Sequence, residues 1–72
     1  MNLEKYIRVV EDFPVEGISF KDVTPLLKDR EAFRFAIKLM SEEIRKENVD
    51  IVVGPEARGF LFGAPIAYEL GV

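Results

Sequence analysis

The fold is decided by residues 51–63, which read IVVGPEARGFLFG. The β-branched run Ile51-Val52-Val53 predicts a strand buried on both faces, which is typical of a parallel sheet. Gly54-Pro55 ends that strand, and a helix is expected from about Gly59 to Leu70. Because strand, loop and helix follow in this order, we expect an α/β fold, the opening of a doubly wound parallel sheet.

The loop at residues 54–59 has the features of a phosphate or pyrophosphate site. In open α/β sheets, ligands bind beyond the carboxyl ends of the strands. The N-terminus of the following helix favours an anion. Gly54 and Gly59 allow the backbone to approach a ligand closely, and Arg58 adds a planar guanidinium group suited to phosphate. The spacing fits neither a Walker loop nor a dinucleotide-binding fingerprint.

Simpler explanations of the same loop stay open at this point. A glycine-rich connection between strand and helix is often only a tight turn, and Arg58 can pair with Glu56 at the surface. The Glu56 carboxylate would repel a bound phosphate unless it turns away or a magnesium ion lies between them.

The first twenty residues are expected to form a short helix and a loop. Apolar side chains recur at residues 3, 6, 7 and 10, which predicts a helix over 3–10, with Asn2 as its cap. Pro14 and Gly17 predict a loop over residues 11–20. Three residues of this loop are apolar, and their pattern alone places them in the core: Phe13, Ile18 and Phe20.

The middle of the chain predicts the main helix. Thr24-Pro25 is expected to cap a short turn through Lys28, and Asp29 is expected to cap a helix from Arg30 to about Glu47. Its apolar stripe is Phe33, Ala36, Ile37, Met40 and Ile44, and its charged face is Arg34, Lys38, Glu42, Arg45 and Lys46. In the last helix, Pro65 predicts a kink or a restart and Gly71 a C-terminal cap. Val72 is where a next strand should begin.

Composition excludes several classes of function. The chain has 72 residues, no cysteine and no histidine, so disulfides, zinc sites of the Cys/His type and a Ser-His-Asp relay are excluded within it. A net charge of −3 weighs against nucleic-acid binding. No apolar stretch reaches the ~20 residues of a membrane span, and the charged N-terminus is no secretory signal. A soluble, cytoplasmic protein without membrane partners is therefore expected.

Two motifs together resemble the adenine phosphoribosyltransferase family. The first runs from Asp12-Phe13-Pro14 through GISFKDVTPLLKD at residues 17–29, and the second is GPEARGFLFG at residues 54–63. The resemblance extends from about Ile7 to Val72. It implies a type I phosphoribosyltransferase, of which this chain would be the N-terminal part. The family makes AMP and pyrophosphate from adenine and phosphoribosyl pyrophosphate with magnesium, usually as a homodimer.

The resemblance also implies roles for individual residues. Glu56, Ala57, Arg58 and Gly59 match the pyrophosphate loop, in which related proteins have a non-proline cis peptide, here Glu56–Ala57. Phe20 matches the aromatic residue that stacks on adenine. Ser19 and Lys21 match positions whose main-chain groups bind the base edge. No residue of this chain is implied as catalytic or as a metal ligand.

The chain also departs from the family pattern. Lys21 replaces a common arginine, Ser19 a commonly apolar residue, and Pro55 a common Ile, Leu or Thr. The acidic pair with its Thr-Gly-Gly-Thr-like stretch and the flexible catalytic loop are not within these residues, so we expect the 72 residues alone to be inactive.

We expect one domain segment over 1–72, with a base-side helix and hood loop at 1–28 and a helix-strand-loop-helix region at 29–72. Two alternatives stay open. One is a non-catalytic purine- or phosphate-binding module or remnant of the same fold. The other is a related purine enzyme with a different base specificity, although the motif at 12–29 favours adenine.

Overall fold

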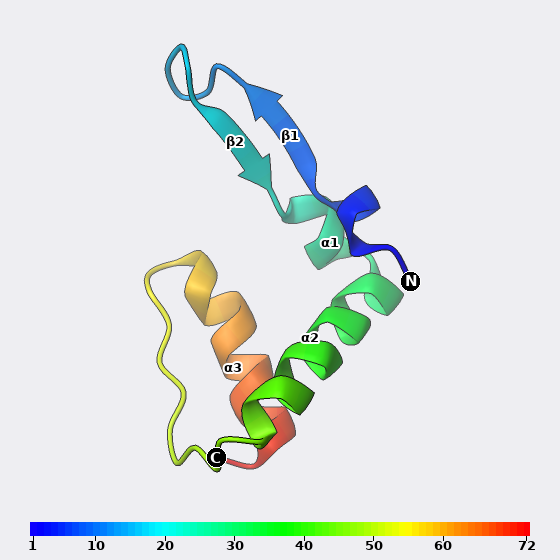
Figure 1. Cartoon of the computed structure of the whole chain (residues 1–72), viewed down its shortest axis with the longest axis vertical. Coiled ribbons are helices and arrows are strands. Elements are labelled where there is room, and N and C mark those ends of the chain that lie inside the picture. The colour runs from blue at the N-terminus through cyan, green and yellow to red at the C-terminus, as the bar shows by residue number, and fades with distance from the viewer. The chain divides into compact units, whose positions relative to one another are not determined.

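A computed structural model describes all 72 residues, which form two compact units, Met1–Arg34 and Phe35–Val72 (Figure 1). The first unit contains a short 3-10 helix, a hairpin of two strands and a short helix. Helix α2 (Arg30–Arg45) begins in the first unit and continues in the second, which ends with α3 (Arg58–Leu70). No helix is both long enough and apolar enough to span a membrane.

The N-terminal segment is a 3-10 turn followed by a strand. The turn η1 spans Leu3–Tyr6, and the Asn2 side chain accepts a hydrogen bond of 3.1 Å from the Glu4 N–H. Strand β1 (Arg8–Glu11) then pairs antiparallel with β2 (Ser19–Asp22). The expected helix over 3–10 is therefore wrong beyond Tyr6. Its second half contains β-branched residues, which favour a strand once a partner strand is available.

The expected loop at 11–20 is a hairpin turn with a strand at each end. The Asp12 carboxylate accepts a 2.8 Å bond from the Gly17 N–H, and the Phe13 N–H donates to the Ile18 carbonyl at 3.1 Å. Gly17 has φ of 89°, a conformation that glycine adopts without a steric penalty. Phe13 is 49% exposed and Ile18 46%, so placing them in the core was wrong. Their apolar side chains lie on the surface of the hairpin.

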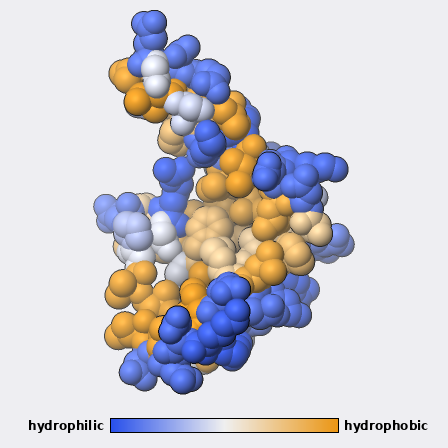
Figure 2. Space-filling model, in the orientation of Figure 1, coloured by the Kyte–Doolittle hydropathy of each residue, from blue (hydrophilic) through white to orange (hydrophobic).

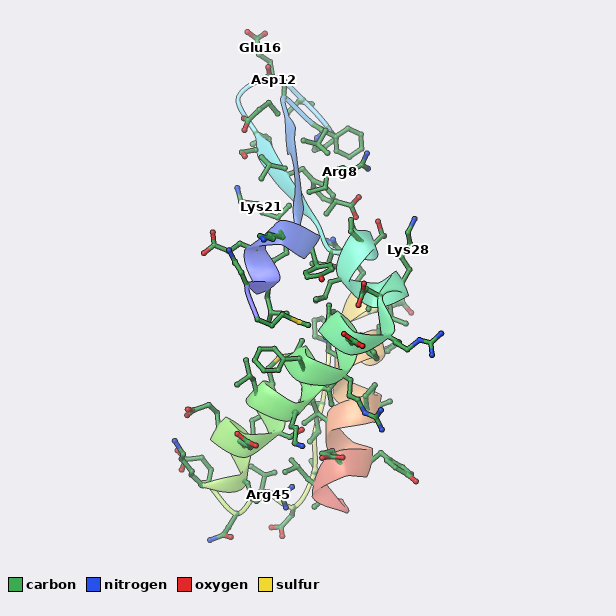
Figure 3. The ribbon with its side chains drawn as sticks, turned by 90° about the vertical axis from the view of Figure 1, so that its right-hand side faces the viewer. Arg8, Asp12, Glu16, Lys21, Lys28 and Arg45 are labelled. Atoms are coloured by element: carbon green, nitrogen blue, oxygen red, sulfur yellow. The ribbon has the colours of Figure 1, made fainter.

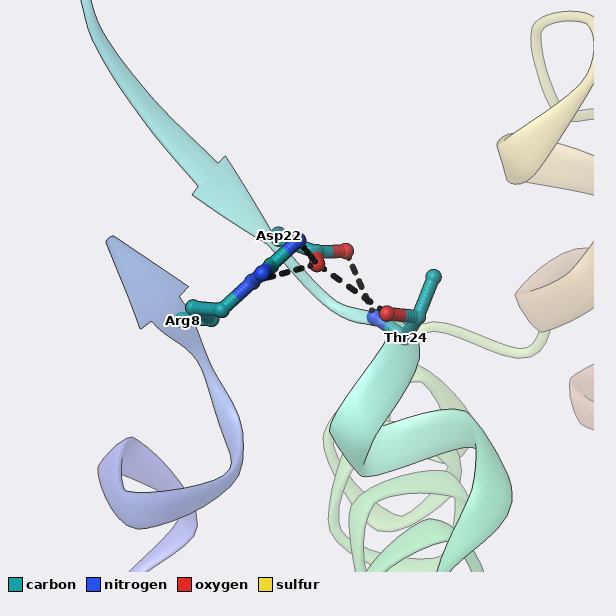
Figure 4. A network of polar contacts seen from close by, with 3 residues as sticks. All are labelled: Arg8, Asp22 and Thr24. Carbon is teal, nitrogen blue, oxygen red and sulfur yellow. Dashed lines mark hydrogen bonds and ion pairs between the residues drawn. The ribbon is translucent and has the colours of Figure 1, made fainter. Parts of the chain in front are cut away.

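Asp22 joins the hairpin to α1 (Thr24–Lys28), as Figure 4 shows. Its carboxylate accepts from both the N–H and the hydroxyl of Thr24, each at 3.0 Å, and pairs with the Arg8 guanidinium at 2.8 Å. These bonds, above all that from the Thr24 N–H, hold the pKa of Asp22 below its ordinary value. Asp22 thus accepts the first N–H of α1 from the residue before the N-cap position, Val23, and Thr24, which was expected as the cap, is the first helical residue.

Helix α2 begins as expected and buries a face of small residues. The Asp29 carboxylate accepts from the Ala32 N–H at 2.9 Å, which confirms it as the cap. All five residues of the expected charged face are exposed. The buried residues are Ala32, Ala36, Ile37 and Ser41, whereas Phe33, Met40 and Ile44 are only half-buried. The buried face of α2 is thus centred on its small residues and not on the bulky ones that the sequence predicted. Small side chains allow a helix to pack most closely.

Helix α3 runs without a restart through Pro65 and ends at Gly71, which has φ of 79° and donates to the Ala67 carbonyl at 2.9 Å. The helix and its glycine cap are as predicted.

Residues Ile51–Val53 are not a strand in this structure, which corrects the sequence prediction. A strand needs a neighbour to bond its N–H and C=O groups, and the only sheet present is the β1–β2 pair. Ile51 is 76% exposed and Val53 86%, and only Val52 is half-buried, close to Gly63. Figure 2 shows the hydrophobic surface that results over the segment between α2 and α3. An apolar hollow of about 420 Å³ lies between residues 52–54 and α3.

The unpaired segment predicts weak cooperativity for these 72 residues as an isolated polypeptide. We expect broad thermal unfolding and binding of a hydrophobic dye, because Ile51 and Val53 are exposed and no disulfide compensates. Circular dichroism against temperature and dye fluorescence check this. A sharp transition whose midpoint does not depend on concentration would contradict it.

The Asp22 network predicts an acid-dependent loss of stability. Because the folded-state pKa of Asp22 is lowered, its contribution is fully present above the ordinary aspartate pKa of about 3.9 and is lost as the pH falls through the lower folded-state value. In the protein that contains this segment, Asp22→Asn should lower the free energy of unfolding at neutral pH, and its gap to the wild type should close in acid. Denaturant titrations at several pH values measure this gap. Asp50→Asn, at an exposed aspartate, is the control, and a gap that persists unchanged in strong acid would disprove the assignment.

Candidate functional site

The loop before α3 brings the predicted pyrophosphate residues together at a helix N-terminus. The Glu56–Ala57 peptide bond is cis, as expected from the resemblance. Ala57 precedes the helix, and its carbonyl accepts from the Phe60 N–H at 3.1 Å. Arg58 is the first helical residue. Glu56, Ala57 and Arg58 are exposed, so the loop is open to a ligand in solution.

Helix α3 differs from the other helical segments at its N-terminus. Asn2, Asp22 and Asp29 accept backbone N–H groups at the starts of η1, α1 and α2. No side chain caps α3. The N–H groups of its first turn and the helix dipole therefore favour an anion from outside the chain.

Two glycines hold this loop closed on itself. A Cβ on Gly54 would lie 2.7 Å from the Gly59 carbonyl oxygen, and a Cβ on Gly59 would meet the Pro55 ring and lie 3.1 Å from the Gly54 carbonyl carbon. Neither position has room for a side chain. Pro55, a departure from the family pattern, therefore packs directly against Gly59. This close backbone contact fixes where α3 starts, and therefore from which point of the helix the Arg58 side chain extends.

The predicted base-side residues lie on the hairpin of the first unit. The register pairs Arg8 with Asp22 and Val10 with Phe20, so these four side chains share one face. Ser19 and Lys21 lie on the other face, and Figure 3 shows Lys21 and Arg8 on opposite sides of the hairpin. The Lys21 ammonium donates to the Ser19 hydroxyl at 3.1 Å, and that hydroxyl donates to Glu11 at 3.2 Å.

The departures Ser19 and Lys21 are thus bonded to each other, away from Phe20. Because they are two residues apart on one strand, their main-chain groups point to the same side of β2, whereas those of Phe20 point to the other. This geometry is compatible with the main-chain role that the resemblance implies for both.

Phe20 borders a small pocket on its face of the hairpin. Its ring lies edge to face with that of Phe13, with centroids 5.3 Å apart and planes at 68°. The pocket has a volume of about 250 Å³ and is lined by Arg8, Val10, Phe13, Phe20 and Asp22. One end is aromatic and the other is charged, which suits a flat ring with a polar edge.

Arg8 and Asp22 are pocket residues that the sequence analysis missed. Asp22, which had no role assigned from the sequence, is only 8% exposed. Its position two residues before Thr24-Pro25 is a signal for a helix cap. Arg8 carries no local signal, because only the strand pairing brings it to Asp22.

The chain itself offers no metal cage. Nowhere do three or more acidic, histidine or cysteine side chains gather closely enough to hold an ion. Glu56 is the acidic residue of the loop at 54–59, and one carboxylate does not make a site for a hard divalent cation.

Comparison with known proteins gives a consistent result. No protein-family model matches the chain. It is 62% identical over 71 residues to the adenine phosphoribosyltransferase of Clostridium tetani, covering 99% of this chain and 41% of that protein. It is 60% identical over 72 residues to the enzyme of the same name from Methanococcus maripaludis, covering all of this chain and 42% of that protein. The chain thus spans about two fifths of the length of these curated relatives.

Solved structures agree with the sequence matches. The adenine phosphoribosyltransferase of Thermoanaerobacter pseudethanolicus superimposes with a TM-score of 0.93 at 50% identity, covering 97% of this chain and 42% of that chain. The Giardia lamblia enzyme, solved with 9-deazaadenine, gives 0.89 at 34% identity, covering 97% of this chain and 39% of that chain. In sequence and in fold, the chain therefore corresponds to the N-terminal portion of the adenine phosphoribosyltransferases.

Proposed function

We propose that the protein containing these residues is an adenine phosphoribosyltransferase, which converts adenine and phosphoribosyl pyrophosphate into AMP and pyrophosphate. Residues 1–72 would form the N-terminal part of its single catalytic domain. In the reaction, a purine nitrogen attacks the anomeric carbon of the sugar, the bond to the pyrophosphate oxygen breaks, and pyrophosphate leaves. The high identity to relatives of that name supports this proposal.

The single observation that carries the proposal is the glycine-closed loop at the uncapped start of α3. We assign Glu56, Ala57, Arg58 and Gly59 to pyrophosphate binding. Negative charge grows on the pyrophosphate oxygens as the bond to the sugar breaks. The Arg58 guanidinium and the backbone N–H groups of the loop would stabilise that charge, and donors that are already in position do so without reorganising during the reaction.

We assign Ser19, Phe20 and Lys21 to adenine binding. The half-buried Phe20 ring offers an apolar face beside a pocket. Stacking of a base on such a ring contributes about 1–3 kcal/mol. Ser19 and Lys21 would bind the base edge through their main chain, so the replacement of arginine by lysine at residue 21 should matter little. None of these side chains is placed as a general base.

Magnesium would enter with phosphoribosyl pyrophosphate, whose phosphate oxygens are the ligands that this hard cation prefers. The chain itself supplies no cage for it. A homodimer and a cytoplasmic location complete the proposal, both from the resemblance.

Replacing Arg58 tests the pyrophosphate assignment. In the protein containing this segment, Arg58→Ala should weaken pyrophosphate binding by roughly tenfold to a hundredfold, because a charge-assisted hydrogen bond is lost. Adenine alone should bind as before. Isothermal titration calorimetry with each ligand measures both affinities. Arg34→Ala, which removes an exposed arginine of α2, is the matched control. An unchanged pyrophosphate affinity in Arg58→Ala would overturn the assignment.

Alanine substitutions at Gly59 and Gly63, the two glycines within α3, test whether the loop needs its close backbone contact. Alanine raises helix propensity at both positions by up to about 1 kcal/mol. At Gly63 the added Cβ has only an ordinary contact, 3.8 Å from Val52, so Gly63→Ala should be neutral or stabilising. At Gly59 it would overlap the Pro55 ring. Gly59→Ala should therefore destabilise the protein by about 1–3 kcal/mol and weaken pyrophosphate binding.

Denaturant unfolding and pyrophosphate titration of both variants check the glycine prediction. Equal behaviour of Gly59→Ala and Gly63→Ala would mean that the loop does not need the close backbone approach.

A further inference from the structure

We propose that Arg8 is a positioning residue for base binding, which acts through Asp22 on the face of the hairpin that carries Phe20. This inference rests on the proposed function, because it concerns the affinity for adenine. Neither residue belongs to the adenine or pyrophosphate residues assigned above.

The geometry of the hairpin places Arg8 at the charged end of the Phe20 pocket. Arg8 lies directly opposite Asp22, and Val10, two residues further on β1, lies directly opposite Phe20. All four line the same pocket with Phe13. A change in the position of β1 therefore moves the side chains that surround the Phe20 ring.

Asp22 is the point where the hairpin is held. Its side chain is only 11% exposed, and its Oδ2 accepts from the Nε of Arg8 at 3.0 Å and lies 2.8 Å from the Nη2 of Arg8, on strand β1. The same carboxylate also accepts hydrogen bonds from the Thr24 N–H and hydroxyl at the start of α1. The two strands are thereby tied to the helix that follows them. Without Arg8, Asp22 would still accept both hydrogen bonds from Thr24 at the start of α1, but β1 would lose its side-chain link to Asp22.

The charges explain why arginine suits this position. The Arg8 side chain is 67% exposed, so the net contribution of its ion pair to stability is small. Its planar group nevertheless places two nitrogens on one carboxylate oxygen, which restricts the strand more than a single point contact does. Arg8 and Asp22 bond to each other and Asp22 bonds to Thr24, all within the first unit. Loss of Arg8 should therefore change base binding and leave phosphate binding unchanged.

Steady-state kinetics of the protein containing this segment test the inference. We expect Arg8→Ala to raise the KM for adenine about fivefold, the upper end of what an exposed ion pair contributes. The kcat and the KM for phosphoribosyl pyrophosphate should stay within about twofold, which is the ordinary scatter of a surface substitution. Arg8→Lys, which keeps the charge but offers a single contact, should restore part of the adenine KM. Glu43→Gln breaks an exposed ion pair between Glu43, on α2, and Lys46, just after the end of α2, and is the control, with all constants unchanged.

The outcomes separate this inference from the proposed function. A wild-type protein that does not consume adenine overturns the function. An active wild type whose adenine KM is unchanged by Arg8→Ala overturns the positioning role, as does an equal rise in the KM of both substrates. If Arg8→Ala does not fold, Arg8→Lys decides. If Arg8→Lys has the melting temperature of the wild type, a raised KM for adenine supports the role, and an unchanged KM for adenine overturns it.

Discussion

The contact between the backbones of Gly54 and Gly59 is the constraint on which the second half of the chain depends. Two segments five residues apart approach so closely that neither can carry a Cβ. This approach turns the chain sharply, starts α3 at Arg58 and leaves the first turn of that helix without a side-chain cap. An exposed arginine at a helix N-terminus then adds a full positive charge to the partial charge of the helix dipole.

In the first half of the chain, the corresponding constraint is the Asp22 carboxylate and not a close backbone contact. Asp22 accepts the first N–H of α1 and pairs with Arg8, so a carboxylate of the chain itself lies at the start of this helix. The same physical interaction, an acceptor at a helix N-terminus, is internal at α1 and open at α3. The proposed roles of the loop at 54–59 and of the hairpin face come from the family resemblance, and this difference is compatible with them.

Local signals predicted part of this fold well. The Asp29 cap, the charged face of α2, the extent of α3 and the Gly71 cap all follow from short-range rules about helix ends and periodicity. The helix at 3–10 was wrong because the same apolar spacing serves a strand when β2 pairs with it. The strand at 51–53 lacks the partner that its sequence pattern requires. Both differences arise from pairing between distant residues, which no local pattern contains.

The candidate site divides in the same way. A phosphate or pyrophosphate site in the loop at 54–59 was predicted from glycines, an arginine and a following helix, all within a few positions, and it stays a prediction. Arg8 and Asp22 were missed because they are fourteen residues apart and meet only through the register of the hairpin. The surface positions of Phe13 and Ile18 also escaped the pattern, since apolar residues usually predict a core.

The most direct test is the reaction itself, measured as release of pyrophosphate from phosphoribosyl pyrophosphate by the protein that contains these residues. Adenine, hypoxanthine and guanine are supplied in parallel with magnesium, and the nucleotide product is identified by mass. The account predicts release that depends on adenine, with AMP formed in equal amount, and little release with the other two bases. Release with hypoxanthine or guanine but not adenine, or binding of adenine without any release, would contradict it.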